Sequence, residues 1–195
     1  MTYRLGLTGS IGMGKSTTAA MFRDLGHPVW DADAVVHDLY APGGAAVGPV
    51  GAAFPEALRD GGIDRAALKQ ALAADPGALA RLEALVHPLV ARDRQAFVAR
   101  HADRPLVVLD IPLLFESAAP PDLDGVAVVS TDADTQAARV LSRPGMTPET
   151  LRMILARQMP DVEKRRRADW IIPTDTPEAA RAAVARIVKE VTAHA

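Results

Sequence analysis

Residues 9–16 read GSIGMGKS, and this segment restricts the fold more than any other stretch of the chain. The apolar run YRLGLT precedes it, and the segment KSTTAAMF begins a helical pattern after it. Each glycine loses extra backbone entropy on ordering, so three glycines in six positions indicate a loop that needs backbone without side chains. The order of strand, glycine-rich loop and helix predicts the opening unit of an α/β fold.

The loop matches the pattern G-x-x-x-x-G-K-[ST], in which backbone amides surround phosphate oxygens and a helix N-terminus adds partial positive charge. The Lys15 ammonium is expected at the β- and γ-phosphates, and the Ser16 hydroxyl at Mg²⁺. The alternative is a glycine-rich turn that ends in Lys-Ser by chance, which the flanking strand and helix disfavour. The ATP-binding residues predicted here are Gly9, Ile11, Gly12, Met13, Gly14, Lys15, Ser16 and Thr17.

Strand and helix patterns alternate along the rest of the chain. Further strands are expected in HPVWDAD, RPLVVLD, DGVAVVS and ADWIIPT. Apolar strands that alternate with helices predict a P-loop NTPase-type α/β fold: a five-stranded parallel sheet with helices on both faces. We find no convincing strand between residues 34 and 103, where apolar residues recur at helical spacing and the pattern breaks at Pro76 and Pro88.

A helical block of this length exceeds one crossover connection, so we interpret it as an inserted subdomain. Two shorter helices, joined by the turn RPGMTP, are expected over residues 133–143 and 147–158. The predicted organisation is a single domain with a core of 1–33, 104–132 and 159–195, a helical insertion of 34–103 and a pair of helices within 133–158.

Composition and charge limit the classes of function. The formal net charge of −2 gives no general attraction to nucleic acid or to an anionic membrane. The absence of cysteine excludes disulfides, thiol catalysis and cysteine-bound zinc. The basic run EKRRR at 163–167 has no interleaved aromatic residue and is interpreted as a solvated helix end. Without a long apolar run or room for a signal peptide, a cytoplasmic location with no membrane or nucleic-acid partner is expected; the patterns set no oligomeric state.

Two carboxylates alternate in WDAD, at the exit of the second predicted strand. In an extended segment the side chains of Asp31 and Asp33 point the same way, toward the cleft at the carboxyl ends of the strands. Asp33 is the candidate base for an acceptor hydroxyl that attacks the γ-phosphate. Alternatively, Asp33 caps a helix that starts near Ala34, and one residue can do both. Asp31 is expected to hold its neighbour or a water.

A further carboxylate and a pair of arginines complete the candidate site. Asp110 ends the apolar run LVVLD and is expected to hold the Mg²⁺ shell opposite Ser16, or else to make a structural hydrogen bond. Arg139 and Arg143 are spaced i, i+4 on a predicted helix, where like charges repel by roughly 0.2–0.5 kcal/mol. This spacing favours an anion beside them, with a solvated face as the alternative. Residues 157–158 are expected to approach the same site.

The pattern favours a small-molecule kinase. The chain has no asparagine, so the Asn-Lys-x-Asp signature that reads guanine in small GTPases is absent. One alternative is a P-loop kinase for another small metabolite, such as a nucleoside monophosphate or a sugar acid. Another is a nucleotide-binding module without catalytic turnover.

Several stretches together resemble the dephospho-CoA kinase family, in that family's order and spacing and over residues 3–172. They are GLTGSIGMGKST, DAD, HP, LDIPLLFE, RVLSR, RQ and AD, and the heptapeptide DIPLLFE is the most specific of them. The resemblance implies transfer of the ATP γ-phosphate to the ribose 3′-hydroxyl of dephospho-CoA with Mg²⁺ present. It also implies that the helical insertion of 34–103 carries much of the acceptor site, and that residues 133–158 form a lid that closes over ATP.

The resemblance also implies roles for individual residues. Asp33 would be the base and Lys15 would stabilise the transferring phosphoryl group, while Arg139 and Arg143 would clamp phosphates on lid closure. The residues carried over to acceptor binding are Thr8, Asp33, His87 and Leu114. From the residues alone, His87 is interpreted as a capping or packing histidine, because no second histidine lies at ligand spacing.

Two departures from the family pattern stand out. Ser10 and Met13 replace an expected glycine and serine at variable positions of the loop. The stretch PTDTPE at 173–178 stands where the family has an Asn-Gly-type turn near the adenine pocket, so different contacts to the base are expected there.

Overall fold

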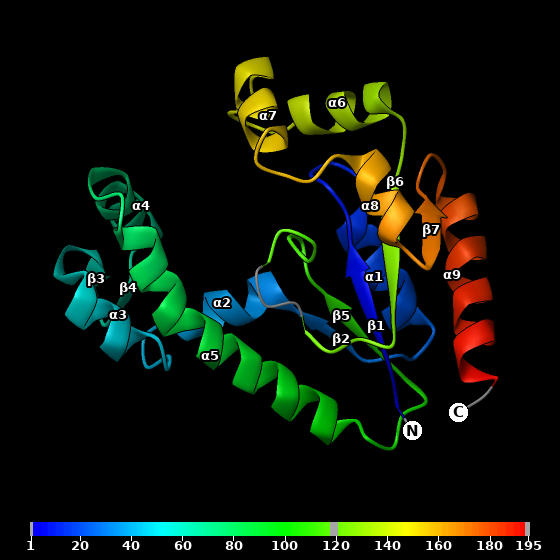
Figure 1. The fold of residues 1–195 in the computed structure, drawn as a ribbon, viewed down its shortest axis with the longest axis horizontal. Coiled ribbons are helices and arrows are strands. Elements are labelled where there is room, and N and C mark those ends of the chain that lie inside the picture. Colours follow the sequence, from blue (N-terminus) through cyan, green and yellow to red (C-terminus); the bar gives the residue numbers. More distant parts are fainter. Residues whose placement is uncertain (1, 118–120, 194–195) are drawn as a thin grey trace. The chain divides into compact units, whose positions relative to one another are not determined.

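The computed structural model describes residues 2–117 and 121–193 (Figure 1). The chain divides into two compact units. One comprises residues 1–30 and 100–195, and the other comprises residues 31–99. The limits of the second unit lie close to those predicted for the helical insertion. Within the described residues, no helix combines the length and the hydropathy that a bilayer span needs.

The first unit is built on a parallel sheet with the strand order β2-β5-β1-β6-β7 (Figure 1). In this sheet β1 pairs in parallel with β5 and β6, and β6 pairs in parallel with β7. The five predicted strands and the P-loop-type α/β fold are thereby confirmed. The bounds are Tyr3–Thr8 (β1), Val29–Asp31 (β2), Leu106–Asp110 (β5), Gly125–Ser130 (β6) and Trp170–Pro173 (β7). Because Leu7 lies opposite Asp110, β1 and β5 end at the same edge of the sheet.

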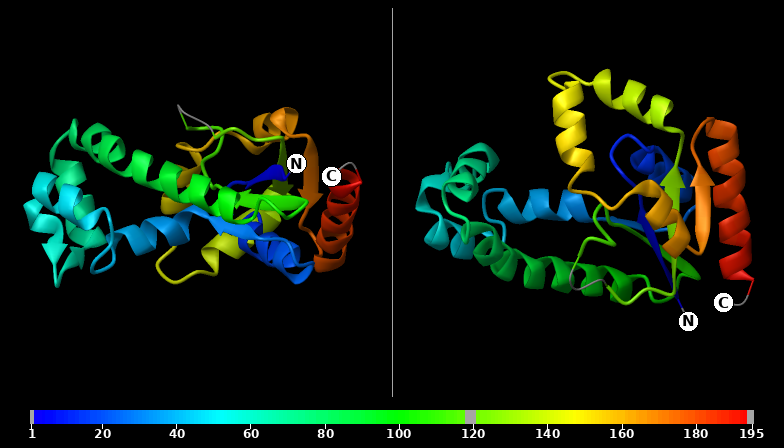
Figure 2. Two further views of the ribbon diagram at one scale, coloured as in Figure 1. Left: turned by 90° about the horizontal axis from the view of Figure 1, so that it is seen from below. Right: turned by 45° about the horizontal axis from the view of Figure 1, so that its top comes forward.

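Apolar side chains bury both faces of this sheet. Alternate residues of its strands, such as Leu5 and Leu7, join one core cluster with α1 (Lys15–Asp24) and α9 (Pro177–Thr192). Figure 2 shows α8 (Asp161–Arg167) on the opposite side of the sheet from α1. Each large apolar side chain buried in this way contributes roughly 1.5–3 kcal/mol, which fixes the strands that carry the glycine-rich loop.

Two short helices follow β6 within residues 133–158, the segment predicted to be a lid and called the lid segment below. These are α6 (Ala133–Leu141) and α7 (Pro148–Leu155), capped by Asp132 and Thr147. Both helices are shorter than predicted, because α6 ends before the turn that contains Gly145, whose φ is 77°. Arg143 therefore lies beyond the helix, and the prediction that it shares a helical face with Arg139 is wrong.

The second unit is mainly helical. It contains α2 (Ala32–Tyr40), α3 (Val47–Ala53), the 3₁₀ turn η1 (Pro55–Ala57), α4 (Arg65–Ala74) and α5 (Ala78–Arg100). It also contains a two-stranded antiparallel pair, β3 (Leu58–Arg59) and β4 (Gly62–Ile63), which corrects the expectation of no strand here. Each strand is only two residues long, too short for a period-2 pattern to appear in the sequence.

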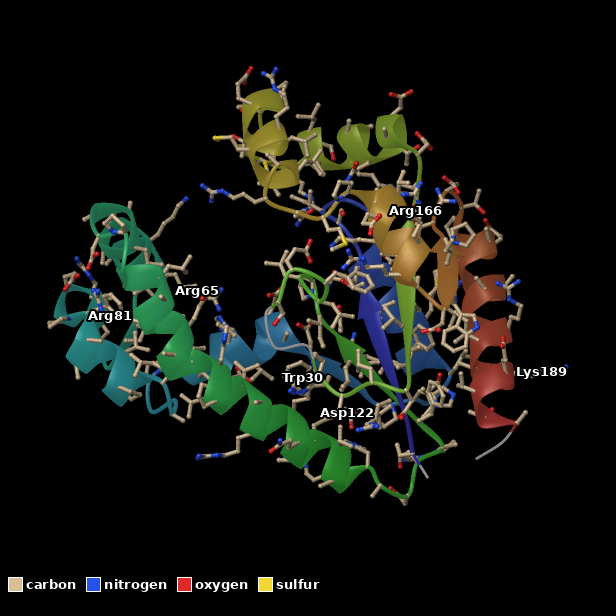
Figure 3. All side chains as sticks on the ribbon, in the orientation of Figure 1. Trp30, Arg65, Arg81, Asp122, Arg166 and Lys189 are labelled. Atoms are coloured by element: carbon tan, nitrogen blue, oxygen red, sulfur yellow. The ribbon has the colours of Figure 1, made fainter. Side chains whose placement is uncertain are left out.

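The second unit has its own core, in which Tyr40, Val50 and Phe54 are buried. Figure 3 shows Arg65 and Arg81 on α4 and α5, and their guanidinium groups lie 5.8 and 5.7 Å from the rings of Tyr40 and Phe54. Both distances are within the range of cation–π contacts, which add to the packing of the two aromatic rings.

The helical pattern breaks at Pro76 as predicted, but the break predicted at Pro88 is wrong. The helix α5 runs through Pro88 without interruption. An interior proline costs a helix about 3 kcal/mol because it lacks the N–H and clashes with the preceding turn. Leu82 and Val86, buried in the second core, hold the preceding turns in place. Burial of this helix therefore offsets the cost of the proline.

Candidate active site

The glycine-rich loop follows β1 and leads directly into α1. Gly14 is the N-cap of α1, with φ 87° in the left-handed region that glycine adopts without strain. A Cβ atom on Gly14 would also lie 3.2 Å from the Cβ atom of Thr174, tighter than most packed contacts. The first N–H groups of an α-helix have no partner within the helix. The start of α1 therefore presents backbone donors and a positive helix end, which suits an anion such as phosphate.

The side chain of Lys15 lies at this helix end and forms an ion pair with Asp110. The Asp110 side chain is 2% exposed and that of Lys15 15% exposed, so the pair is shielded from solvent. Asp110, at the end of β5, thus holds the ammonium group beside the loop. This observation agrees with the structural alternative for Asp110, and the predicted metal contact stays a prediction.

Met13 occupies a variable position of the loop pattern, yet it contributes to the structure of the loop through its side chain and its backbone. Its side chain is buried in the first core, and its sulfur accepts a hydrogen bond from the Thr131 N–H at 3.2 Å. The Met13 N–H donates to the Ser10 carbonyl at 3.2 Å, and its carbonyl accepts from the Thr174 hydroxyl at 2.7 Å. Met13 therefore ties the loop to the ends of β6 and β7.

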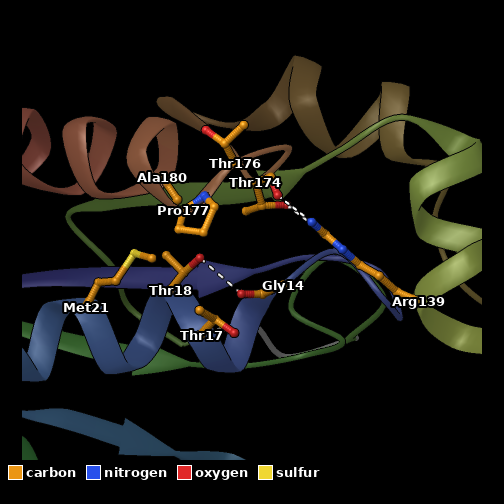
Figure 4. Close-up of a pocket in the computed structure, with 9 residues that line it drawn as sticks. All are labelled: Gly14, Thr17, Thr18, Met21, Arg139, Thr174, Thr176, Pro177 and Ala180. Carbon is orange, nitrogen blue, oxygen red and sulfur yellow. Dashed lines mark hydrogen bonds between the residues drawn. The ribbon is translucent and has the colours of Figure 1, made fainter. Parts of the chain in front are cut away.

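A cavity of about 230 Å³ lies beside the loop (Figure 4). Arg139 reaches it from α6, and its guanidinium donates to the Thr174 carbonyl at 2.6 Å. This volume is below the roughly 300–1,000 Å³ of sites for drug-sized ligands, so it suits one part of a larger ligand. The lining residues are Gly14, Thr17, Thr18, Met21, Arg139, Thr174, Thr176, Pro177 and Ala180. Several of them come from the turn after β7, where the sequence departs from the family pattern.

The two carboxylates of WDAD have different surroundings in the second unit. The Asp31 carboxylate caps α2 and accepts hydrogen bonds from the N–H groups of Asp33 and Ala34, at 2.9 and 3.1 Å. The expectation that Asp31 holds its neighbour is confirmed. The alternative in which Asp33 caps a helix starting near Ala34 is wrong. The extended geometry expected for Asp33 is also wrong, because the helix begins at Ala32. Asp33 lies in the first turn with an exposed side chain.

Three residues carried over to acceptor binding have distinct positions. Thr8 is fully buried, and its hydroxyl donates to the Pro112 carbonyl at 3.1 Å. Leu114 is 2% exposed and packs within the first unit. His87 lies inside α5 with an exposed side chain, so its interpretation as a capping or packing residue is wrong. Acceptor contacts of all three residues stay predictions.

Sequence reasoning missed a buried ion pair between Glu116 and Lys164. Lys164 is fully buried although it belongs to EKRRR, so the solvated-end interpretation is wrong for this residue. Its ammonium nitrogen lies 2.9 Å from Glu116 Oε1 as an ion pair without the angles of a hydrogen bond, and the Met159 N–H donates to the same oxygen at 2.7 Å. Burial raises the pKa of Glu116, but Lys164 and the Met159 N–H together lower that pKa below its ordinary value.

We expect Glu116→Gln to lower the free energy of unfolding by about 3 kcal/mol, because it leaves the buried Lys164 ammonium without its countercharge. Urea denaturation at neutral pH measures this change. Glu163→Gln is a matched control, since Glu163 pairs with exposed arginines on α8, at an expected cost below about 0.5 kcal/mol.

The pH dependence gives a second readout of the same pair. A carboxylate whose pKa is lowered by folding stabilises the protein above its unfolded pKa, and this contribution is lost as the pH falls through the folded pKa. The stability difference between the wild type and Glu116→Gln should therefore shrink in acid below the ordinary glutamate pKa. A difference that is absent at neutral pH, or constant into acid, would contradict this assignment.

Comparisons with known proteins agree with the resemblance seen in the sequence. The chain is 59% identical over 189 residues to a dephospho-CoA kinase of Cereibacter sphaeroides, covering 97% of this chain and 95% of the relative. It is 56% identical over 192 residues to a dephospho-CoA kinase of a Jannaschia species, covering 98% of both.

Solved structures show the same fold. The crystal structure of TT1252 from Thermus thermophilus has a TM-score of 0.86 at 35% identity and covers 97% of both chains. A shikimate kinase from Acinetobacter baumannii has a TM-score of 0.53 at 17% identity over the whole of this chain and 95% of that one, a likeness of fold alone. The sequence model of one family, Dephospho-CoA kinase, matches residues 3–179, which include the loop, the lid segment and all the cavity-lining residues except Ala180. With these relatives matched over nearly their full length, the chain belongs to the dephospho-CoA kinase family.

Proposed function

We propose that this chain transfers the γ-phosphate of ATP to the ribose 3′-hydroxyl of dephospho-CoA, giving CoA and ADP in the last step of CoA biosynthesis in the cytoplasm. Membership of the family over residues 3–179 carries this proposal. The position of Lys15 also supports the proposal. Lys15 lies at the start of α1, and the buried Asp110 holds its ammonium group beside the backbone donors expected to bind phosphate.

On the donor side, α1 and Lys15 bind the phosphates of ATP. The backbone N–H groups at the start of α1 donate to phosphate oxygens, and the ammonium of Lys15 stabilises charge on the γ-phosphoryl group during transfer. Asp110 acts through Lys15 by fixing the position of its ammonium. Arg143, exposed in the turn between α6 and α7, is proposed to bind phosphates when the lid closes.

The cavity beside the loop is proposed to receive the base of ATP. It lies between the first turns of α1 and α9, and Arg139 lines it (Figure 4). The stretch at 173–178 departs from the family pattern, and its residues Thr174, Thr176 and Pro177 then contact the base in place of an Asn-Gly-type turn. Closing of the lid excludes water, which would otherwise compete with the acceptor for the phosphoryl group.

On the acceptor side, Asp33 is the proposed base. The 3′-hydroxyl oxygen forms a bond to the γ-phosphorus while the bond from that phosphorus to the β–γ bridging oxygen breaks. The hydroxyl proton passes to the Asp33 carboxylate, and ADP leaves with the bridging oxygen. Thr8, His87 and Leu114 complete the proposed acceptor site.

The residues present fit Mg²⁺. This ion takes oxygen ligands in octahedral geometry and is usually held by one or two protein oxygens with phosphates and waters. The exposed hydroxyl of Ser16 and the carboxylate of Asp110 are donors of this kind. Among the described residues no group of three or more His, Asp or Glu gathers as a dedicated metal site, in keeping with an ion held largely by its nucleotide. When bound, Mg²⁺ neutralises charge on the β- and γ-phosphates.

An ADP-release assay tests the proposal. Purified protein is incubated with ATP and Mg²⁺ and with either dephospho-CoA or a panel of nucleoside monophosphates, shikimate and sugar acids. ADP release that depends on dephospho-CoA, with CoA identified by mass spectrometry, is the expected result. Release with another acceptor alone, or ATP binding without acceptor-dependent turnover, would overturn it.

A further inference from the structure

Both backbone hydrogen-bonding groups of Ile11, in the middle of the glycine-rich loop, are bound by glutamine side chains. The Gln136 side-chain amide donates to the Ile11 carbonyl at 2.8 Å. The Ile11 N–H donates to the side-chain oxygen of Gln158 at 3.1 Å. Gln136 is 7% exposed, so its contact lies in the protein interior. The expectation that Gln158 approaches the site is confirmed, and one loop residue is held from both sides.

The two glutamines come from opposite ends of the lid segment. Gln136 lies on α6, and Gln158 follows the end of α7. The helix α6 also packs directly on the loop, because a Cβ atom on Gly12 would lie only 2.5 Å from a methyl group of Val140. Gly12 has φ 78°, so glycine fits here both in backbone conformation and in space. The lid segment therefore holds the loop through two polar contacts and one close packing contact.

The two hydrogen bonds run in opposite directions, so each glutamine must present one particular group to the loop. At Gln136 the loop accepts, and at Gln158 the loop donates. Loss of one partner leaves a backbone group without its hydrogen bond, which is costly when the group is buried. The loop conformation seen here thus depends on the lid segment, and the amides that follow Ile11 are the ones that lead into α1.

We propose that Gln136 and Gln158 are positioning residues. Through their hydrogen bonds to Ile11 they hold the phosphate-binding loop in the conformation that binds ATP. This inference rests on the proposed function in one respect, which is that ATP is the nucleotide. Neither glutamine needs to contact ATP. Both act through the loop backbone, so that the loop and the two ends of the lid segment respond to the nucleotide as one element.

Glutamate substitutions at the two positions test whether Gln136 must donate and Gln158 must accept. Gln136→Glu replaces the donating amide with a carboxylate oxygen that faces the Ile11 carbonyl. Gln158→Glu adds the same charge beside the same residue but keeps an oxygen that accepts from the Ile11 N–H. We expect the dissociation constant for a fluorescent ATP analogue to be at least about tenfold higher in Gln136→Glu than in Gln158→Glu. The KM for ATP should follow it, and the KM for dephospho-CoA should change less than about twofold in both.

Gln95→Glu, on an exposed position of α5, is the control for an added charge. Thermal unfolding shows whether Gln136→Glu is folded. If it is not, Gln158→Met, which removes the accepting oxygen without adding charge, should raise the dissociation constant for the analogue by roughly threefold to tenfold. Equal dissociation constants in the two glutamate variants, or in Gln158→Met and the wild type, would overturn the proposal. Binding of the analogue is measured without an acceptor, so failure of the proposed dephospho-CoA reaction is separately visible.

Discussion

Replacing Asp33 with asparagine should lower kcat roughly 10²- to 10⁴-fold and leave the affinity for ATP nearly unchanged. An amide has nearly the shape of the carboxylate but does not take up the proton that the acceptor hydroxyl must lose. The fold should tolerate the change, because the cap of α2 is provided by Asp31 and the Asp33 side chain is exposed. Steady-state assays with dephospho-CoA and titration with an ATP analogue measure the two effects separately.

Asp38→Asn provides the matched control for this experiment. It makes the same chemical change at another exposed position of α2 and should alter kcat by less than about twofold. Normal turnover in Asp33→Asn would show that Asp33 is not the base. Equal losses in both variants would assign the effect to the charge of the helix instead of to proton transfer.

Lys15→Ala should lower kcat by roughly 10²- to 10³-fold and also weaken ATP binding. The ammonium supplies a full positive charge at the phosphate site, and its effect is expected in the ground state and more strongly in the transition state. Removal also leaves the buried Asp110 carboxylate without the Lys15 ammonium, so the free energy of unfolding should fall by a few kcal/mol. Single-turnover kinetics, analogue titration and urea denaturation measure these three effects.

Two further variants separate charge from position at this site. Lys69→Ala removes an exposed lysine from α4 and should leave all three measurements within about twofold, or within about 0.5 kcal/mol for stability. Lys15→Arg keeps the charge but replaces a compact ammonium with a planar guanidinium, so it should restore little of the turnover. Full activity in Lys15→Arg would show that long-range charge is sufficient at this position.

The sheet could be predicted from sequence because strands buried on both faces appear as continuous apolar runs. RPLVVLD and DGVAVVS are such runs, and both became central strands. The glycine-rich loop was equally visible, since its spacing is local and each of its positions has a chemical reason. Helix limits were less accurate, as the passage of α5 through Pro88 shows, because packing within the second unit outweighs a local signal.

The contacts that join distant segments could not be predicted in this way. Glu116 and Lys164 pair across a long separation in sequence, and EKRRR gives no local sign that one of its members is buried. Gln136 and Gln158 both contact Ile11 because the two ends of the lid segment lie beside the glycine-rich loop in the fold. The cap of α2 lies at Asp31 and not at Asp33 because the helix begins at Ala32, directly after the strand.

The Thr174 hydroxyl binds the carbonyls of Met13 and Ser130, while its own carbonyl accepts from Arg139. Thr174 therefore joins the turn after β7 to the glycine-rich loop, to β6 and to α6 at the same time. Serine would preserve the hydroxyl, whereas valine, with the same outline, would release Met13 from β7. A chain without this hydroxyl would still hold its glycine-rich loop through Thr131, Gln136 and Gln158, but it would lose the hydrogen bond that joins Met13 to the end of β7.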